Sequence, residues 1–197
     1  MNLPILSIDT SVFWLKMGFT HLLDLNGYDH MLFLWMVFLY FTGKSYRNLL
    51  AQLSLFTLAH SLSLALSALQ WISVPSLWVE RFIALSIAFS AAYSFYTLGK
   101  KQTKVWISWM LIFLFGLIHG MGFSGLLLSL LGHDSSIIAP LLYFNVGLEL
   151  GQILFVTAIA ALQISLHRYS IRGFQNYQKG SACIGFLLGI SLFITRI

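Results

Sequence analysis

Histidine and carboxylate side chains stand inside stretches that are otherwise strongly apolar. Asp29 and His30 are adjacent at the start of one stretch, His60 and His119 lie within two others, and Glu149 lies within a fourth. An ionisable side chain at the centre of a membrane span costs about 2.5–3.5 kcal/mol on insertion scales, so each needs a partner or a function. Neutral imidazole is the commonest ligand of Zn, Ni, Cu and Fe, and carboxylates add charge and a hard oxygen. We therefore expect a divalent transition-metal site, with a purely structural polar network as the alternative.

The depths of these side chains support a single site. At 1.5 Å per residue, His60 lies about 18 Å and His119 roughly 22 Å from the side that carries the basic loops. Glu149 lies about 17 Å from the opposite side, and His30 stands near the outer end of its stretch. In a hydrocarbon core about 30 Å thick, all four lie between the midplane and the outer surface. Independent polar residues need not agree on one half of the membrane, so the agreement favours one site.

Further polar side chains follow helical spacing and share helix faces that can line the same cavity. Asn145 and Gln152 share a face with Glu149; we expect Asn145 and Glu149 to bind the metal or to accept hydrogen bonds from its ligands, and Gln152 to support the site or line the pathway. Thr57 and Ser61 share a face that His60 borders, and Glu80 opens another apolar stretch. His21 stands in an amphipathic segment, from which it either reaches the site or lies in the membrane interface.

The elements that must position these side chains are membrane helices. Hydrophobic residues make up 58% of the 197 positions and charged residues only 9%, whereas a soluble domain carries about 25%. We expect an all-α, polytopic membrane helix bundle that forms one transmembrane domain over residues 1–197, covered by the lipid bilayer. An amphipathic helix at about 11–24, re-entrant or interfacial, comes before six spanning helices. The spans lie at about 28–43, 49–70, 79–98, 105–131, 138–163 and 180–195.

Three pairs of glycines are spaced four residues apart within the expected spans. Small residues at this spacing let two helices approach closely in lipid, so we assign them to helix packing. The pairs are Gly116 and Gly120, Gly147 and Gly151, and Gly185 and Gly189.

The basic residues predict the orientation of the chain. Eight Lys and Arg residues follow the first, third and fifth expected spans, and segments 71–78 and 132–137 contain none. Because cytoplasmic loops are enriched in Lys and Arg, we expect these eight in the cytoplasm and both termini outside, in a bacterial-type cytoplasmic (inner) membrane. This placement explains the net charge of +5 without a nucleic-acid partner. The eight are Lys44, Arg47, Lys100, Lys101, Lys104, Arg168, Arg172 and Lys179.

Five ordered segments and the C-terminal residues carry a resemblance to a known family. They are GYDHMLF at 27–33, FTLAHS at 56–61, VE at 79–80 with IALS at 83–86, FGLIHGMGF at 115–123, FNVGLELGQ at 144–152 and the closing FITRI at 193–197. From about residue 17 to its end, the chain resembles the HupE/UreJ family of membrane proteins. The resemblance implies permeation of nickel, and sometimes cobalt, into cells with hydrogenase or urease. It also implies a set of metal ligands, namely Asp29, His30, His60, His119 and Glu149.

Two other functions remain open beside a nickel or cobalt permease. An intramembrane zinc-dependent hydrolase or transferase would act on a lipid or membrane-embedded peptide, with Asp29 or Glu149 as general base and Ser61 orienting the substrate. A haem protein would use His60 and His119 as axial ligands. A permease needs a second polar path toward the cytoplasm, where the expected spans hold mostly Ser, Thr and Tyr. The partners we expect are the bilayer and the metal ion, with a homo-oligomer or accessory subunits possible beside them.

Overall fold

Residues 8–39, 46–98, 100, 105–131 and 137–196 are described by the computed structural model of the chain, and every regular element in them is helical. The expected all-α class is therefore confirmed for this part of the chain. The elements are α1 (Ile8–Leu22), the 3-10 helix η1 (Leu25–Gly27), α2 (Asp29–Val37), α3 (Tyr46–Ala68), α4 (Ser76–Thr97), α5 (Val105–Leu131), α6 (Ile138–Tyr169) and α7 (Ile171–Thr195).

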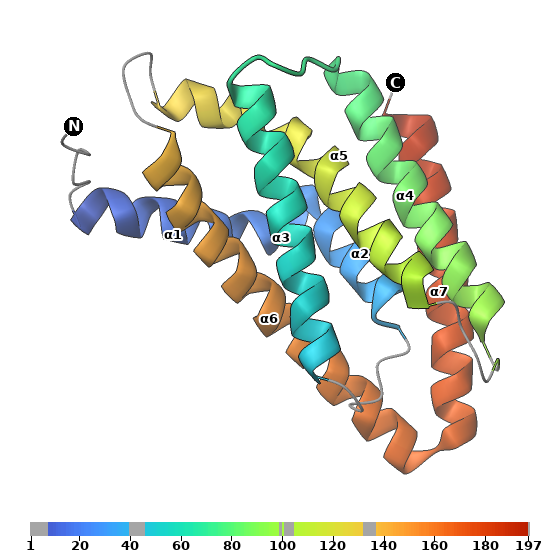
Figure 1. The fold of residues 1–197 in the computed structure, drawn as a ribbon. Helices are drawn as coiled ribbons and strands as arrows, with labels where there is room; N and C mark the ends of the chain where they lie inside the picture. Colours follow the sequence, from blue (N-terminus) through green and yellow to red (C-terminus); the bar gives the residue numbers. More distant parts are fainter. Residues whose placement is uncertain (1–7, 40–45, 99, 101–104, 132–136, 197) are drawn as a thin grey trace.

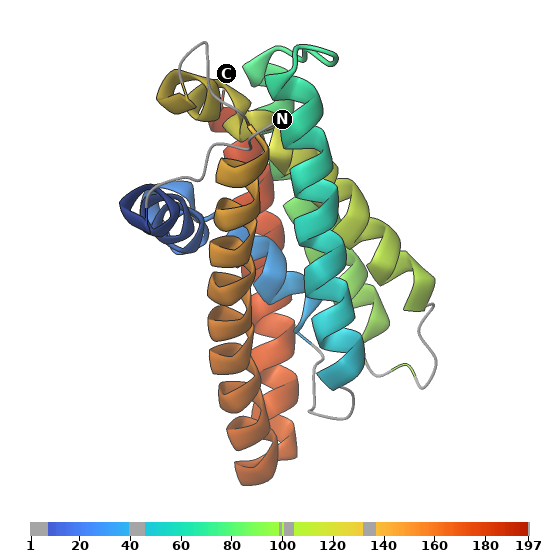
Figure 2. The ribbon, with the colours of Figure 1, turned by 60° about the vertical axis from the view of Figure 1, so that its left-hand side comes forward.

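The long helices α3, α4, α5, α6 and α7 form a bundle, and the chain reverses direction at each connection between them (Figure 1). The short α2 lies inside this bundle, and α1 lies across α6 rather than along it (Figures 1 and 2). The expected helix at about 11–24 is therefore present as α1, which begins earlier, at Ile8, and ends at Leu22. Its crossing orientation is that of a segment that does not traverse the bundle.

Four helices are long and apolar enough to cross a membrane, namely α3, residues Trp106–Leu130 of α5, α6 and α7. The expected count of six spans is thus not confirmed. Helix α4 has 22 residues, but Glu80, Arg81 and several serines reduce its hydropathy. Helix α2 has nine residues, which extend only about 13 Å. The expected first span at 28–43 therefore ends as a helix at Val37, and part of it lies outside the described residues.

Side chains from two neighbouring helices hold the C-terminal end of α2 inside the bundle. The last carbonyls of a helix have no partner within the helix and need another donor when they are buried. The Ser94 hydroxyl of α4 donates to the Met36 carbonyl at 2.7 Å, and the Gln178 amide of α7 donates to the Leu39 carbonyl at 3.1 Å. These bonds allow a helix of nine residues to end in the protein interior, with His30 in its first turn.

Glycines determine which long helices lie closest together. On α5, a Cβ atom at Gly116 would collide with the Phe56 carbonyl of α3, and one at Gly120 would collide with the His60 carbonyl. The α3 backbone can therefore approach α5 because both positions lack a side chain. This confirms the packing role expected for the pair, and it brings the helices that carry His60 and His119 together.

The same device joins α1 to α6. A Cβ atom at Gly18 would collide with the Phe144 carbonyl, and one at Gly147 would collide with the Leu15 carbonyl. Because the backbones touch at this crossing, the last turn of α1, which carries His21, is held against the bundle.

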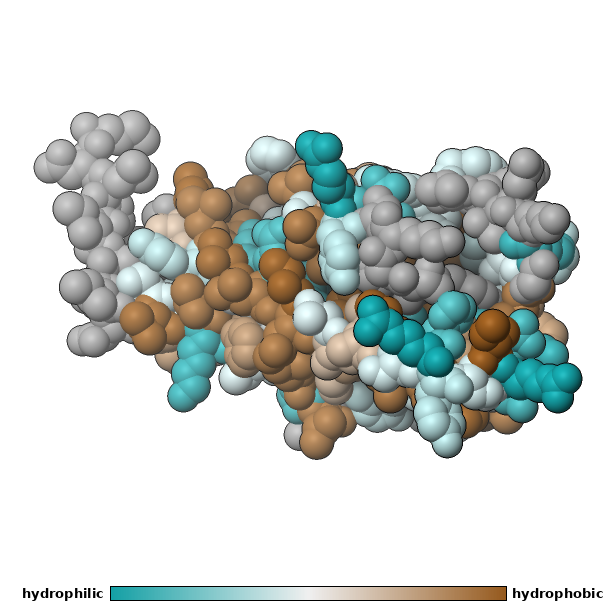
Figure 3. Space-filling view, turned by 90° about the horizontal axis from the view of Figure 1, so that it is seen from below, coloured by the Kyte–Doolittle hydropathy of each residue, from teal (hydrophilic) through white to brown (hydrophobic). Residues whose placement is uncertain are grey.

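Basic residues gather at one end of the molecule. Arg47, Lys100, Arg168 and Arg172 are exposed near the ends of α3, α4, α6 and α7 that lie at the bottom of Figure 1. Seen from that end, hydrophilic side chains gather toward the α6–α7 junction and apolar ones toward α1 (Figure 3). Helices α6 and α7 run beyond the expected limits and meet at Ser170, so the expected basic loop between 163 and 180 is largely helical. Lys44, Lys101 and Lys104 lie outside the described residues.

Candidate metal centre

Three histidines from three helices come together in the half of the bundle opposite the basic end. His21 lies in the last turn of α1, His30 in the first turn of α2, and His60 nearer to Ala68 than to Tyr46 on α3. One nitrogen from each imidazole can be chosen so that all three lie within 4.8 Å of one another. Metal–nitrogen bonds of about 2.0–2.1 Å require ligand nitrogens roughly 3–4 Å apart, so a small inward movement would complete a site. We call these residues the histidine trio.

The break between α1 and α2 explains how His21 and His30 meet. Helix α1 ends at Leu22, and η1 turns the chain before α2 begins at Asp29. The last turn of one helix therefore faces the first turn of the next, and the His21 and His30 ring centroids are 4.7 Å apart. Asp24 and Leu25 of this break are exposed, and a non-helical break at membrane depth needs protein or a water-filled cavity around its backbone.

Four ring nitrogens of the trio are buried and have no hydrogen-bond partner. His21 Nε2, His30 Nε2 and both ring nitrogens of His60 are buried and unpartnered. His60 is 0% exposed and His30 is 2% exposed. Leaving a buried polar atom without a partner costs about 1–3 kcal/mol, so several such atoms at one place require a reason. A metal ion bound by these nitrogens supplies one.

Four phenylalanines enclose the trio and exclude other polar partners. Phe144 lies against His60 with nearly parallel rings, 14° apart, and Phe123 lies 4.3 Å from the His21 ring centroid. Phe56 and Phe115 contact the His30 ring at centroid distances of 5.8 and 6.3 Å. An apolar wall of this kind lowers the local dielectric and shields the ligands from water.

His119 of α5 is the fourth histidine of this cluster. Its ring centroid is 3.7 Å from that of His30 and 4.4 Å from that of Phe115, and its Nδ1 atom is also buried and unpartnered. The structure therefore brings three expected ligands, His30, His60 and His119, into one cluster. It adds His21, which the sequence left between the site and the interface. His30 and Phe115 both pack against the His119 ring.

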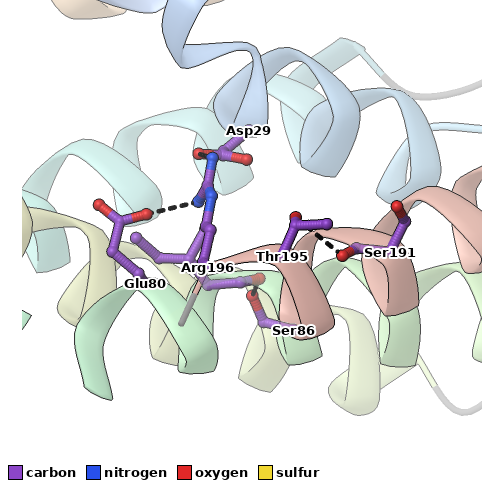
Figure 4. A network of polar contacts seen from close by, with 7 residues as sticks. Asp29, Glu80, Ser86, Ser191, Thr195 and Arg196 are labelled. Carbon is purple, nitrogen blue, oxygen red and sulfur yellow. Dashed lines mark hydrogen bonds and ion pairs between the residues drawn. The ribbon is translucent and has the colours of Figure 1, made fainter. Parts of the chain in front are cut away.

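The adjacent carboxylate, Asp29, is buried and paired with an arginine. Arg196 follows the last residue of α7, and its Nη2 lies 2.8 Å from Asp29 Oδ2. Its Nη1 lies 2.6 Å from Glu80 Oε2 on α4. Figure 4 shows the guanidinium between the two carboxylates. The second oxygen of Asp29, Oδ1, is buried without a partner.

Glu149 and Gln152 form a separate polar group with α3, on the side of His60 that faces the basic end. The Ser54 hydroxyl donates to Glu149 Oε1, and the Thr57 hydroxyl donates to Gln152 Oε1 at 3.0 Å. Ser54 precedes His60 by about 9 Å along the helix axis. Both pairs lie at the crossing of α3 and α6, and we call these four residues the crossing group.

Two further expected residues flank this arrangement. Asn145 is half-buried, and its Oδ1 atom is buried without a partner. The Ser61 hydroxyl donates to the Thr57 carbonyl of its own helix at 2.6 Å. That bond occupies the hydroxyl proton with which Ser61 would orient a substrate.

A pocket of about 560 Å³ opens beside the trio between the end of α1 and α5. Its lining includes His21, Thr20, Asp24, Phe123 and Leu126. Because His21 belongs both to this pocket and to the trio, the pocket gives the buried nitrogens an approach from the end of the molecule opposite the basic residues.

One family model matches nearly the whole chain. A family model described as HupE / UreJ protein matches residues 5–197. The chain belongs to the HupE / UreJ family. No curated protein and no solved structure matches it.

Arg196 is the residue of this HupE / UreJ protein that the sequence reasoning missed at the site. It is the last Arg of the chain and follows an apolar run, so it looks like an ordinary flanking charge. The available signal was the excess of acids near the outer end: Asp29 and Glu80 both open apolar stretches and have no nearby Lys or Arg in sequence except Arg81. Arg81 itself lies over the Trp78 and Phe193 rings, at 5.5 and 5.9 Å.

Proposed function

We propose that this HupE / UreJ protein is a permease for a divalent transition metal ion of the nickel or cobalt type. The histidine trio is the binding station in the outer half of the membrane, and His119 assists it. One observation carries the proposal: imidazoles from three helices converge, and each has at least one nitrogen that is buried without a hydrogen-bond partner. Imidazole suits Ni, Co and Zn, and three neutral donors hold a cargo ion without the charge that would trap it.

The crossing group supports passage beyond the trio. A permease needs a second polar station on the cytoplasmic side of the first, because binding must be strong enough for entry and weak enough for release. Glu149 and Gln152 lie on that side of His60 along α3, within the span. Glu149 therefore serves as the next ligand rather than as a member of the trio. This supplies the polar step that the sequence did not display.

Sidedness follows from the charges at the two ends. The pocket beside His21 opens at the end where Arg196 is paired with Asp29 and Glu80, and the exposed Arg47, Lys100 and Arg172 lie at the other end. By the positive-inside rule the basic end faces the cytoplasm and the pocket faces outside, in a bacterial-type inner membrane. A cysteine placed at Lys100 should resist an impermeant thiol reagent added to intact cells, and labelling from outside would reverse the orientation.

The zinc-enzyme alternative receives less support from the contacts. A hydrolase needs a general base within hydrogen-bond reach of a metal-bound water. Asp29 is held by Arg196, and Glu149 accepts a hydrogen bond from Ser54, so both expected bases are engaged elsewhere. The alternative keeps one favourable feature, which is that three histidines with an open position are a known arrangement for catalytic zinc.

The experiment that tests the proposal is metal uptake by proteoliposomes. Purified wild-type protein is reconstituted with a trapped metal-sensitive dye, and Ni²⁺ or Co²⁺ is added outside. His30→Ala is the test variant because the His30 ring contacts His21, His60 and His119. Cys183→Ser, a change at an exposed position of α7, is the control.

Uptake by the wild type and the Cys183→Ser control, with loss in His30→Ala, supports the permease. Elemental analysis of the same dialysed samples separates the alternatives. About one equivalent of zinc that resists dialysis and depends on His30, without uptake by the wild type, would replace the permease with the enzyme.

A further inference from the structure

Arg196 holds a buried acid and an exposed acid at the same time. Asp29 has 8% of its side chain exposed and Glu80 has 46%, while the arginine side chain has 21% exposed. Each terminal nitrogen of the guanidinium engages a different carboxylate. Because the two terminal nitrogens of the guanidinium bind separate carboxylates, the side chain can release one acid and stay bound to the other.

The position of this charge matters because it adjoins the candidate metal centre. Asp29 is the residue before His30, and the Arg196 guanidinium lies 2.8 Å from the Asp29 carboxylate. A positive charge at this place repels a divalent cation that approaches the histidines. It also occupies the buried carboxylate that would otherwise attract the cation. Asp29 Oδ1, which is buried and unpartnered, shows that the carboxylate is not fully satisfied by the arginine.

We infer that Arg196 is a tethered cation that competes with the metal ion for Asp29, and that Glu80 receives it when the ion binds. In the metal-free protein the guanidinium neutralises Asp29, which a buried carboxylate requires. When a divalent ion reaches the trio, it takes over that neutralisation. Arg196 then leaves Asp29 and remains paired with Glu80 at the surface. This rests on the proposed function and adds a positioning residue to it.

Competition with the metal ion and simple anchoring of α7 predict opposite effects of removing Arg196. If Arg196 only fastens α7 to α2, its removal loosens His30 and weakens metal binding. If it competes with the ion, its removal strengthens binding. Loss of Glu80 should have the opposite effect, because the displaced guanidinium then has no acid to keep and returns more readily to Asp29. The effect of Glu80 should also vanish once Arg196 is gone.

The experiment is an equilibrium titration of Ni²⁺ into the full-length protein purified in detergent. The variants are Arg196→Gln, Glu80→Gln and the double variant. We expect Arg196→Gln to bind about tenfold more tightly than the wild type and Glu80→Gln severalfold more weakly. The double variant should match Arg196→Gln. Arg172→Gln removes the same charge from the exposed far end of α7 and should match the wild type.

Weaker or unchanged binding by Arg196→Gln overturns the inference, as does a Glu80→Gln effect that persists in the double variant. If Arg196→Gln does not fold, Glu80→Gln and Arg196→Lys decide. Lysine keeps the charge but cannot bind both carboxylates at once, so the Ni²⁺ affinity of Arg196→Lys should fall between those of the wild type and Glu80→Gln. If Arg196→Lys and Glu80→Gln both bind Ni²⁺ as the wild type does, the inference is overturned. His60→Ala is titrated in parallel: if the wild type shows no His60-dependent binding, the proposed function fails instead.

Discussion

The histidines and the carboxylates of this bundle are treated in opposite ways, although they lie close together. Each imidazole of the trio has at least one nitrogen that is buried without a partner, inside a wall of phenylalanine. The acids each have a partner, since Asp29 and Glu80 bind Arg196 and Glu149 binds Ser54. A neutral imidazole can remain unpartnered at moderate cost, whereas a buried carboxylate without a counter-charge costs far more.

This difference between imidazoles and carboxylates indicates which side chains can bind an external ion without first losing a partner. Nitrogens without partners lose little when a metal arrives, because no hydrogen bond must be broken first. A paired carboxylate must exchange its partner for the metal. Under the proposed function, the trio would receive the ion, and the acids would adjust its affinity and its passage.

Loss of one imidazole of the trio should have the largest effect on metal binding. His60→Ala should weaken Ni²⁺ binding by at least about 100-fold, the upper limit for residues that merely support a ligand. Isothermal titration of the purified protein measures it. His167→Ala changes an exposed histidine near the basic end and should leave the affinity unchanged. Similar affinities for both variants would remove His60 from the site.

The packing beneath the trio gives the next largest effect. Gly120→Val places carbon atoms against the His60 carbonyl and the Ser63 hydroxyl, so α3 and α5 must separate. We expect a loss of about 1–3 kcal/mol in stability, as for other overpacked interiors. Thermal unfolding in detergent measures it. Gly125→Ala on the same helix meets no atom within 4 Å and should be neutral; equal unfolding temperatures would show that the contact is not tight.

Glu149 of the crossing group should affect the rate of metal uptake more than the affinity for the metal. Glu149→Gln keeps the shape but removes the charge of the station after the trio. Without the negative charge that attracts a divalent ion, uptake should slow by roughly tenfold, which corresponds to about 1.4 kcal/mol in the barrier. Equilibrium affinity at the trio should change by no more than about twofold. Proteoliposome uptake and titration of the same sample separate the two quantities, and a parallel loss of affinity would place Glu149 at the trio.

The smallest effect concerns the partner of that acid. Ser54→Ala removes the hydroxyl that donates to Glu149 and should slow uptake by about twofold to fivefold, as expected for one hydrogen bond of about 0.5–1 kcal/mol. Ser165→Ala is the control, since its hydroxyl bonds only its own helix at Ala161. Uptake rates that do not differ between the two variants would separate Ser54 from the path.

The sequence by itself determined the class of the protein and most of its ligand types. A charged fraction of 9% and repeated apolar runs leave little besides helices in lipid, because unsatisfied backbone groups exclude other structures there. The free-energy cost of placing an ionisable side chain within a membrane span singles out His30, His60 and His119 from the sequence alone. Helical spacing likewise identified the glycines of α5 that bring two of these histidines together.

Only the tertiary structure decided how the polar residues are grouped. Sequence spacing fixes depth along one helix, but not the angle at which two helices cross or where a short helix ends. The crossing of α1 over α6 brings His21 to the trio, and the crossing of α3 and α6 gives Glu149 to Ser54. Arg196 reaches Asp29 because α7 returns beside the start of α2. These contacts join residues far apart in the chain, and their energies depend on side-chain geometry that a pattern in one sequence does not contain.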